Sequence, residues 1–529
     1  MAQPEGSVTD EYDVIVIGAG LAGLTAAYHL TKTIPGCKVA VLEAKDRVGG
    51  RTHTVTMQGA NGPDTWDLGG QWVSRTQHHI LWLLKELGME HYPQFTKGRK
   101  LQQYGANHRV QSFEGEVPAF SIFALLDLMN FEWKTDSVAK TVPCDAPWKA
   151  PNADRYDNMT FETYVAQNTW TKSARDLIGK VFYAVNGSEE RGYSALNYLF
   201  YLNSGISNRM LYFNEDGAAQ ESRIKGGAQI VSKKLAEKIG SSNLHFTEPV
   251  LCIDQSDAEV DGKVKVQTLS GKTFSCKYVI SAMPTNCAAS LQYSPVPIRR
   301  QNMASYMRMG NLFKFIITYK TAFWREKGFS GEIMNFCHEK VERGSYAGPV
   351  LYVADCTTSN ESPGLVGFYN NADHWGTKKY EERKAAVLEH VAEFLGPEAK
   401  SPIEFRDKDW ITEPYNGGCP VNLCITGAAE FWDAIREPFG RIHWAGTETA
   451  TYWNGYLSGA VQSGLRAADE VASRLDPKQC PRVSNVLRSL DDLSSKDRQQ
   501  GKGNSSWWML GMIAVGMVIL ALVISQVWK

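Results

Sequence analysis

The sequence predicts an α/β protein (α+β overall) in which a nucleotide-binding sheet carries an inserted second domain and a single C-terminal transmembrane helix. Near the N-terminus, a run of β-branched residues, a glycine-rich turn and a helix pattern follow one another over residues 12–33. Several hundred residues of mixed strand and helix pattern follow without an internal repeat. Residues 507–528 are uncharged and largely apolar, as a membrane-spanning helix requires.

The first of these elements predicts a dinucleotide site. Residues 12–17 read as a strand buried on both faces, and 38–43 as a second strand that ends at Glu43. Between them, the segment GAGLAG at 18–23 matches G-x-G-x-x-G and opens a helix over 21–33. This order of strand, turn, helix and acidic residue is typical of a Rossmann-like unit.

Each glycine of the turn has a physical task. Gly18 permits the tight turn, Gly20 lets the backbone approach a pyrophosphate, and Gly23 lets the helix pack closely on the strand. The helix N-terminus presents free N–H groups to phosphates, and Glu43 is placed to accept hydrogen bonds from a ribose. Ala19 and Ala44 lie beside these groups and complete the predicted contact set.

Two further glycine pairs favour FAD over NAD as the ligand. They occur in RVGGR at 47–51 and in DLGGQW at 67–72, where they let the backbone pass close to a long ligand. Arg51 can neutralise the pyrophosphate through two parallel hydrogen bonds. At this point the sequence resembles the flavin amine oxidase superfamily, although desaturases and the Rab GDP-dissociation inhibitors share its fold. The predicted contacts from the second segment are Gly69, Gly70, Gln71 and Trp72.

A tryptophan and a Gly-Gly-Cys segment mark the flavin end of the predicted site. Trp410 is followed by NGGC at 416–419, which resembles the segment that bonds covalently to the flavin 8α-methyl group in monoamine oxidases. The resemblance implies a covalent link at Cys419; taken alone, a cysteine in a turn is usually inert. The monoamine oxidases place a tyrosine directly after this cysteine as one wall of an aromatic cage, whereas this chain has Pro420, which offers no comparable π-face.

A lysine on a later strand is the predicted catalytic residue. The segment MGNLFK at 309–314 is similar to the strand that carries the active-site lysine of the superfamily, near the flavin N5. Strand alternation places Phe313 and Phe315 on the face opposite Lys314, which leaves Lys314 facing solvent or a cavity. The alternative is a surface lysine; we expect the cavity.

The strongest match to the family lies near the end of the catalytic part, in RIHWAGTETA at 441–450 and WNGYLSGA at 453–460. A strand there delivers Gly446, Thr447 and Glu448 to the ribityl and phosphate region. The helix that begins near Leu457 directs its positive end at the flavin N1/C2 carbonyl, which favours the reduced cofactor. By resemblance, Tyr456 is a catalytic and substrate-binding wall of the aromatic cage, Phe368 lines the same cavity, and Val250 contacts the adenine side.

The resemblance implies an FAD-dependent monoamine oxidase that converts a primary aromatic or biogenic amine to aldehyde, ammonia and hydrogen peroxide, with O2 as acceptor. Two alternatives stay open. One is an oxidase of the same superfamily acting on polyamines or L-amino acids; the other is a non-catalytic binding protein that kept the flavin fold. No metal-binding motif is present.

The pattern of apolar, polar and turn-forming residues also predicts further helices and strands and the domain boundaries. Predicted elements are helices near 80–87, 229–239 and 455–475, a hairpin formed by 263–269 and 273–278, and strands at 278–282 and 441–444. The predicted FAD-binding domain has three parts, 10–97, 218–290 and 406–475; the substrate domain has two, 98–217 and 291–405; a polar tether covers 476–506 and the anchor 507–528.

The apolar C-terminal segment predicts a membrane protein. Its 22 residues span about 33 Å as a helix, enough for a bilayer core of roughly 30 Å. With no signal peptide pattern at the N-terminus, we expect the catalytic part to face the cytosol. The resemblance implies the mitochondrial outer membrane and a possible homodimer; the endoplasmic reticulum is the alternative membrane. A net charge of −1 and ten irregularly spaced cysteines indicate no nucleic-acid partner and free thiols.

Overall fold

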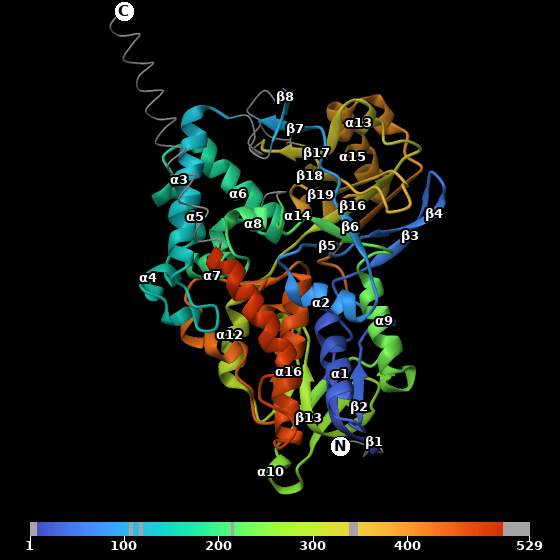
Figure 1. Cartoon of the computed structure of the whole chain (residues 1–529), viewed down its shortest axis with the longest axis vertical. Coiled ribbons are helices and arrows are strands. Elements are labelled where there is room, and N and C mark those ends of the chain that lie inside the picture. The colour runs from blue at the N-terminus through green and yellow to red at the C-terminus, as the bar shows by residue number, and fades with distance from the viewer. Residues whose placement is uncertain (1–7, 105–108, 116–119, 213–215, 338–347, 501–529) are drawn as a thin grey trace, which may run out of the picture.

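The computed structural model describes residues 8–104, 109–115, 120–212, 216–337 and 348–500. In this part of the chain, two large sheets and a group of helices surround one central region (Figure 1). The first sheet and its helices occupy the lower half of Figure 1, the second sheet lies at the upper right, and helices α3 to α8 lie along the left side.

The first sheet is built around β1, whose residues Val14 to Ile17 are almost completely buried. Strands β2 and β13 pair with β1 in parallel on its two sides, and β22 pairs in parallel with the end of β13. The strands of this sheet are β1 (Val8–Ile17), β2 (Val39–Leu42), β10 (Leu244–His245), β11 (Val250–Asp254), β12 (Val264–Thr268), β13 (Thr273–Ser281), β14 (Gln292–Ser294) and β22 (Ile442–Trp444).

Helices α1 and α16 pack against each other beside this sheet, as their adjacent ribbons in Figure 1 show. Their contact is close because Gly464 of α16 leaves no room for a side chain: an added Cβ would lie 2.4 Å from the Ala22 carbonyl oxygen. The helices that pack into the core beside this sheet are α1 (Leu21–Thr33), α2 (His78–Glu86), α9 (Gln229–Ile239) and α16 (Leu457–Leu475), which confirms the predicted helices at these places.

The second sheet has the strand order β20-β16-β19-β18-β17-β7-β8. One of its faces packs on helix α15 (Tyr380–Leu395) through Phe313, Phe315 and Phe405. The opposite face therefore looks toward the first sheet. Its strands are β7 (Arg99–Tyr104), β8 (Arg109–Phe113), β16 (Phe313–Thr318), β17 (Phe329–Asn335), β18 (Val350–Asp355), β19 (Gly364–Tyr369) and β20 (Glu404–Asp409).

A helical layer closes the remaining side. Helix α7 is its most buried member, because nine of its residues from Ala195 to Ser204 are buried among apolar neighbours. The layer comprises α3 (Ile122–Ala139), α4 (Ala153–Asp157), α5 (Phe161–Asn168), α6 (Lys172–Asn186), α7 (Ala195–Ser204) and α8 (Asn208–Tyr212).

Two predicted strand boundaries need correction. The predicted strands 273–278 and 278–282 are one continuous strand, β13. Strand β1 pairs with it along its length, β12 pairs with its first half and β22 with its end. Strand β14 belongs to the first sheet, pairing with β11, although residues 291–405 were expected in the substrate domain. The hairpin of β12 and β13 forms as predicted, antiparallel, with Gly271 at a φ of +88° in its turn.

The predicted polar tether is wrong for the residues that the structure describes. Residues 485–500 are helical. Leu487 and Leu490 are buried in the same core as α2 and α16, and Asp491 lies 3.0 Å from His79 of α2. This segment therefore packs on the catalytic body, because its apolar residues recur at helical spacing among the charged ones.

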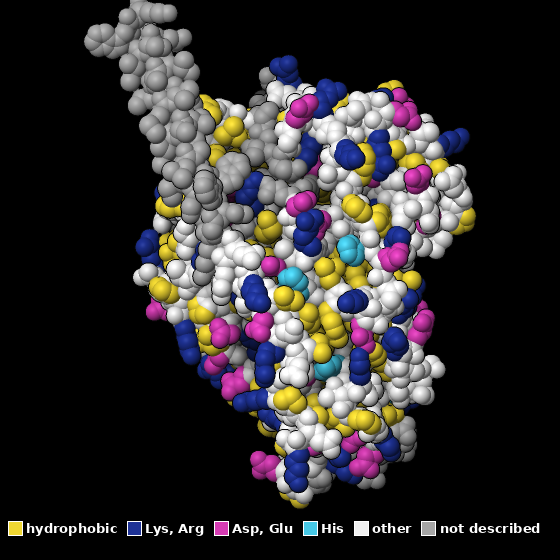
Figure 2. Space-filling model, viewed as in Figure 1, with side chains coloured by type: hydrophobic (Ala, Val, Ile, Leu, Met, Phe, Trp, Pro, Cys, Tyr) yellow, Lys and Arg dark blue, Asp and Glu magenta, His cyan; other side chains and the backbone are white. Residues whose placement is uncertain are grey.

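Within the described ranges, no helix combines the length and the apolar character that crossing a membrane needs. The predicted span at 507–528 lies outside those ranges. On the face shown in Figure 2, acidic and basic side chains are interspersed over the described surface, in keeping with the near-zero net charge.

Candidate active site

A continuous cavity of about 610 Å³ lies where the two sheets and the helical layer meet. It extends from the glycine-rich turn after β1 to the inner face of the second sheet. Its volume is in the range of sites that bury most of a small-molecule ligand. Segments hundreds of residues apart thus contribute to one site.

The nucleotide end of the cavity is built by the turn after β1. Gly18 has a φ of +100°, which only glycine adopts without strain, and an added Cβ on Gly23 would lie 2.0 Å from the Gly18 carbonyl oxygen. Around Gly20, by contrast, a Cβ would meet no atom within 4 Å, so space remains for a ligand against this backbone. These are the three conditions that a pyrophosphate-binding turn requires.

Glu43 closes this end as a buried carboxylate at the end of β2. Its Oε2 accepts a hydrogen bond of 2.6 Å from the Ala19 N–H, and its side chain borders the cavity. Burial raises the pKa of Glu43 above its usual value, although the N–H groups of Lys45 and Ala19 oppose that shift. A ribose hydroxyl that donates to Glu43 would satisfy the carboxylate further.

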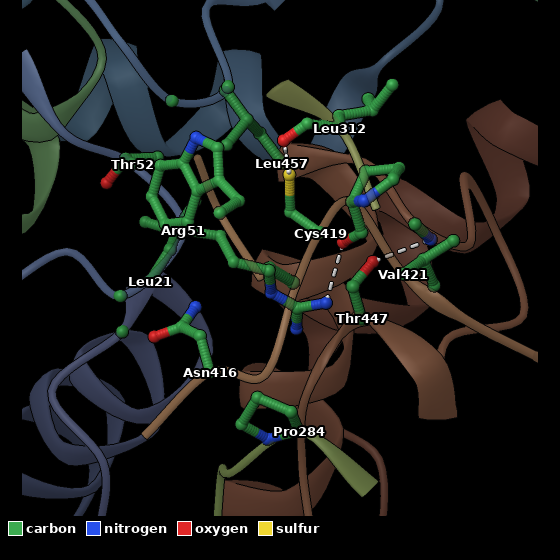
Figure 3. Close-up of a pocket in the computed structure, with 18 of the residues that line it drawn as sticks. Leu21, Arg51, Thr52, Pro284, Leu312, Asn416, Cys419, Val421, Thr447 and Leu457 are labelled. Carbon is green, nitrogen blue, oxygen red and sulfur yellow. Dashed lines mark hydrogen bonds between the residues drawn. The ribbon is translucent and has the colours of Figure 1, made fainter. Parts of the chain in front are cut away.

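Arg51 has a buried partner that the sequence analysis did not predict. Its guanidinium donates two parallel hydrogen bonds to Glu448, of 2.6 and 3.1 Å. A third hydrogen bond, of 2.7 Å, goes to the Pro420 carbonyl and is drawn as a dashed line from Arg51 in Figure 3. Glu448 needs this cation, because its side chain is only 1 % exposed. The expected contact of Arg51 with a pyrophosphate stays a prediction. Arg51 still borders the cavity, and Glu448 lies behind it.

Cys419 lies in the cavity wall beside Leu312 (Figure 3). Gly418 before it has a φ of +125°, and the Cys419 N–H donates to the Gly310 carbonyl at 2.9 Å. These contacts fix the sulfur 3.9 Å from the Leu312 carbonyl oxygen. Burial raises the pKa of the Cys419 thiol to about 12, so the thiol is protonated at neutral pH. The Trp410 indole packs beside the sulfur and donates to the Leu68 carbonyl at 2.9 Å.

Lys314 faces the cavity, as strand alternation predicted. Its side chain is buried, and its Nζ donates hydrogen bonds of 2.8 Å to the Gly69 carbonyl and to Gln71 Oε1. Burial lowers the pKa of Lys314 to about 8, with Asp67 opposing that shift. A lysine near the cofactor can therefore change its charge within the physiological range.

Tyr456 is the N-cap residue of α16. Its side chain makes no capping hydrogen bond to the first turn of that helix. The first N–H groups of α16 are thus available to a ligand. The Tyr456 ring lies 6.2 Å from that of Tyr201, nearly parallel to it, and its hydroxyl accepts from Tyr201 at 3.0 Å. Trp453 meets the same ring edge-on at 5.1 Å. Pro420 also borders the cavity.

The structure brings most of the predicted site residues to this one cavity. Three do not border it: Ala19 and Gly23 lie within the turn, and Glu448 lies behind Arg51. The predicted residues that border the cavity are Gly18, Gly20, Glu43, Ala44, Arg51, Gly69, Gly70, Gln71, Trp72, Val250, Lys314, Phe368, Trp410, Cys419, Gly446, Thr447, Tyr456 and Leu457.

Several cavity residues have no counterpart in the sequence predictions. They lie on the helical layer, on the loop after α8 or on the far strands of the second sheet, and no motif marks them. Alternation within the strands could have shown which residues share a face, but the pairing of the strands was needed to place that face. These residues are Lys180, Tyr201, Gln220, Glu332, Met334 and Tyr352.

A dinucleotide-binding turn at one end of the cavity, with a buried lysine, cysteine and tyrosine at the other, defines a flavin-dependent oxidoreductase. Residues 21–472 match the family described as flavin containing amine oxidoreductase, and the chain belongs to this family.

Curated relatives agree with this assignment. The chain is 37% identical to flavin-containing amine oxidase A of Canis lupus familiaris over 507 residues, which cover 94% of this chain and 91% of that protein. It is 35% identical to flavin-containing amine oxidase B of Homo sapiens, over 88% of this chain and 86% of that one. It is 34% identical to the probable flavin-containing monoamine oxidase A of Dictyostelium discoideum, over 88% and 98%.

Solved structures share the fold. A putrescine oxidase bound to putrescine has a TM-score of 0.80 and 28% identity, covering 88% of this chain and 100% of that one. The cyclohexylamine oxidase of Brevibacterium oxydans has a TM-score of 0.79 at the same identity and coverage. The protein is therefore an FAD-dependent amine oxidase that uses small-molecule amines and O2, and not a non-catalytic binding protein.

Proposed function

We propose that the enzyme deaminates primary aromatic monoamines. One amine, one O2 and one water give one aldehyde, one ammonia and one hydrogen peroxide. The observation that carries this proposal is the aromatic lining of the substrate end: Trp72, Tyr352, Phe368 and Tyr456 all border the cavity there. An aryl side chain packs well among aromatic rings, which contribute both burial and ring–ring contacts.

FAD supplies the two-electron oxidation of the amine C–H bond and passes the electrons to O2. The chain's own residues bind and orient. Tyr456, held by Tyr201 and Trp453, gives the substrate amine one rigid aromatic wall. Lys314 places a positive charge where negative charge develops as O2 is reduced. The same charge disfavours a bound ammonium, so the amine enters the site uncharged.

Charge argues against a polyamine substrate. Three lysines border the cavity, Lys45 near the nucleotide end and Lys180 and Lys314 near the substrate end. Glu332, the acidic residue at the substrate end of its described lining, is paired with Lys100, the atoms being 3.2 Å apart. A substrate with a second ammonium would therefore meet no uncompensated negative charge among these residues. An L-amino-acid substrate would need a cation in the cavity to bind its carboxylate. Lys180 is the residue that would supply this cation.

Peroxide release from a panel of amines tests this proposal. We expect phenethylamine to be oxidised with a kcat/KM at least tenfold above those of putrescine, spermidine and L-phenylalanine. A preference for a diamine or polyamine would contradict the proposal, as would a preference for the amino acid. In the latter case Lys180→Met would abolish the activity on L-phenylalanine and leave that on phenethylamine.

We also propose a covalent bond between the flavin and Cys419. The resemblance of the Gly-Gly-Cys segment supports it, as does the position of the sulfur in the cavity wall. Protein precipitated with acid is expected to keep its yellow flavin, whereas the Cys419→Ala variant should release it. The matched control is Cys424→Ala, since Cys424 is also buried but does not border the cavity. Flavin release from the unmodified protein would contradict the bond.

The proposed location of the enzyme is the mitochondrial outer membrane. Residues 507–528 are the proposed C-terminal anchor, and the catalytic part faces the cytosol. The apolar composition of the anchor and its basic neighbours Lys502 and Lys529 support this location. A fluorescent reporter fused to residues 501–529 should label mitochondria, and labelling of the endoplasmic reticulum would contradict this.

We propose a homodimer on family resemblance alone; sedimentation of detergent-solubilised enzyme tests it.

A further inference from the structure

The helix formed by residues 485–500 contacts the loop that leads into α16. Arg498 of this helix donates a hydrogen bond to the Thr451 carbonyl, and its guanidinium carbon lies 3.9 Å from the centre of the Tyr452 ring. The hydroxyl oxygens of Ser495 and Tyr452 are 2.5 Å apart and share a hydrogen bond. A cation above an aromatic ring is attracted to its π-face, so three contacts hold the first part of the loop on this helix.

A hydrogen-bond network joins the same helix and loop to α16. Gln462 of α16 accepts from the Thr451 N–H at 2.9 Å and donates to the Thr451 hydroxyl at 2.6 Å. The same amide donates to Asp491 of the 485–500 helix at 3.2 Å, and Asp491 also lies 3.0 Å from the His79 ring nitrogen. The loop and the helix therefore share one set of contacts, and a change in the helix reaches the loop.

The next residue of the loop is strained. Trp453 has a φ of +51°, in the left-handed region that bulky side chains rarely adopt. Such a residue keeps this conformation only where its surroundings hold it. Its N–H donates to the Ser204 carbonyl at 2.9 Å, and its indole N–H donates to the Thr76 carbonyl at 3.1 Å. The contacts of its neighbour Tyr452 with the 485–500 helix are the third part of this support.

Trp453 in turn positions Tyr456, the proposed aromatic wall of the substrate site. The Tyr456 N–H donates to the Trp453 carbonyl at 3.0 Å, and the two rings meet edge-on at 5.1 Å. Tyr456 borders the cavity, whereas no described residue of the 485–500 helix does. A change in the backbone of Trp453 would thus move a ring that faces the substrate.

We propose that Arg498 and Ser495 are positioning residues for amine binding, which act through the loop at 451–456 to hold the ring of Tyr456 in place. Without their contacts the strained loop relaxes and the ring shifts. This inference rests on the proposed function, because it takes Tyr456 as a wall of the substrate site. The reaction with O2 depends on Lys314 of β16, which lies outside this chain of contacts, so the two half-reactions should respond differently.

The first test separates the two half-reactions in each variant. We expect Arg498→Met to lower kcat/KM for phenethylamine about fivefold and Ser495→Ala about twofold, because a displaced wall misaligns the amine. The rate constant of the reduced enzyme with O2 should stay at the wild-type value. Arg498→Lys keeps a charge near the Tyr452 ring and a hydrogen-bond donor, so its loss should be smaller. The matched controls Arg488→Met and Ser489→Ala, exposed on the same helix, should change neither quantity.

A double-mutant cycle with Tyr456→Leu tests whether the effect passes through the ring. Residues that act together have non-additive effects, so Arg498→Met should cost less than about twofold in a Tyr456→Leu background. The cycle is measured with the amine that the enzyme oxidises fastest. A preference for a diamine, which would contradict the proposed substrate, therefore leaves this test valid. An equal loss in both backgrounds overturns the inference and leaves the proposed substrate standing.

Hydrogen exchange follows the loop itself, without catalysis. In the flavin-loaded enzyme, amides of residues 451–456 should exchange at least about tenfold faster in Arg498→Met than in Arg488→Met, since their local support is lost. Amides of β16 should exchange at the same rate in both variants. Exchange in the loop that stays at the wild-type rate in Arg498→Met and Ser495→Ala overturns the inference. So does a loss of kcat/KM that is equally large in Arg488→Met.

Discussion

The charge of Lys314 should control how fast the reduced enzyme reacts with O2. Burial lowers its pKa to about 8, from an ordinary value near 10.5. About 90% of the molecules then carry the positive charge at pH 7 and about 10% at pH 9. If the protonated amine stabilises the negative charge that develops on oxygen, the rate constant with O2 should fall roughly tenfold between these pH values.

The assay is stopped-flow mixing of anaerobically reduced enzyme with oxygenated buffer, followed by flavin absorption. The variant Lys314→Met is the reference, since it keeps the length of the side chain and removes the charge; we expect it to react slowly and without this pH dependence. A wild-type rate that stays level from pH 7 to pH 9 would refute the reasoning. So would a Lys314→Met variant that keeps the wild-type pH profile.

Three further outcomes follow from the contacts of the site. Glu448→Gln leaves Arg51 without its buried counter-charge and should lower the free energy of unfolding by about 3–5 kcal/mol, measured by urea denaturation; a loss below about 1 kcal/mol would contradict a structural role for the pair. Tyr456→Leu should lower kcat/KM for phenethylamine at least tenfold, whereas Tyr456→Phe keeps the ring and should lose little; similar losses in both would mean that the hydroxyl matters more than the wall. Burial lowers the pKa of His79, although the hydrogen bond to Asp491 opposes that shift. Below about pH 6.5 the unfolded chain takes up a proton on this residue, whereas the native state disfavours that proton. Docking of residues 485–500 should weaken as the pH falls through that range, seen as faster hydrogen exchange at pH 5.5 than at pH 7.5.

Local sequence patterns were sufficient to predict the nucleotide end of the site. The turn at Gly18, the helix at Leu21–Thr33 and the carboxylate of Glu43 lie within one continuous stretch, so each follows from its neighbours. Lys314 was also predictable, because alternation with two buried phenylalanines fixes its face. The sequence could not show the Arg51–Glu448 pair, since its members are 397 positions apart.

The far end of the cavity was beyond sequence reasoning for a related reason. Glu332, Gln220 and Tyr201 come from a strand, a loop and a helix whose relative positions depend on the pairing of the second sheet and the packing of the helical layer. The helix at 485–500 was misjudged because its charged residues dominate its composition, while only Leu487 and Leu490 indicate the buried side.

The packing of residues 485–500 has a practical consequence for shortening the chain to remove the proposed anchor. Composition alone suggests cutting the chain after the catalytic body, near residue 476. That cut would uncover the apolar side of α2 and α16 and would remove the carboxylates that pair with His78 and His79. A chain that ends at residue 500 keeps this surface covered and still lacks the apolar tail.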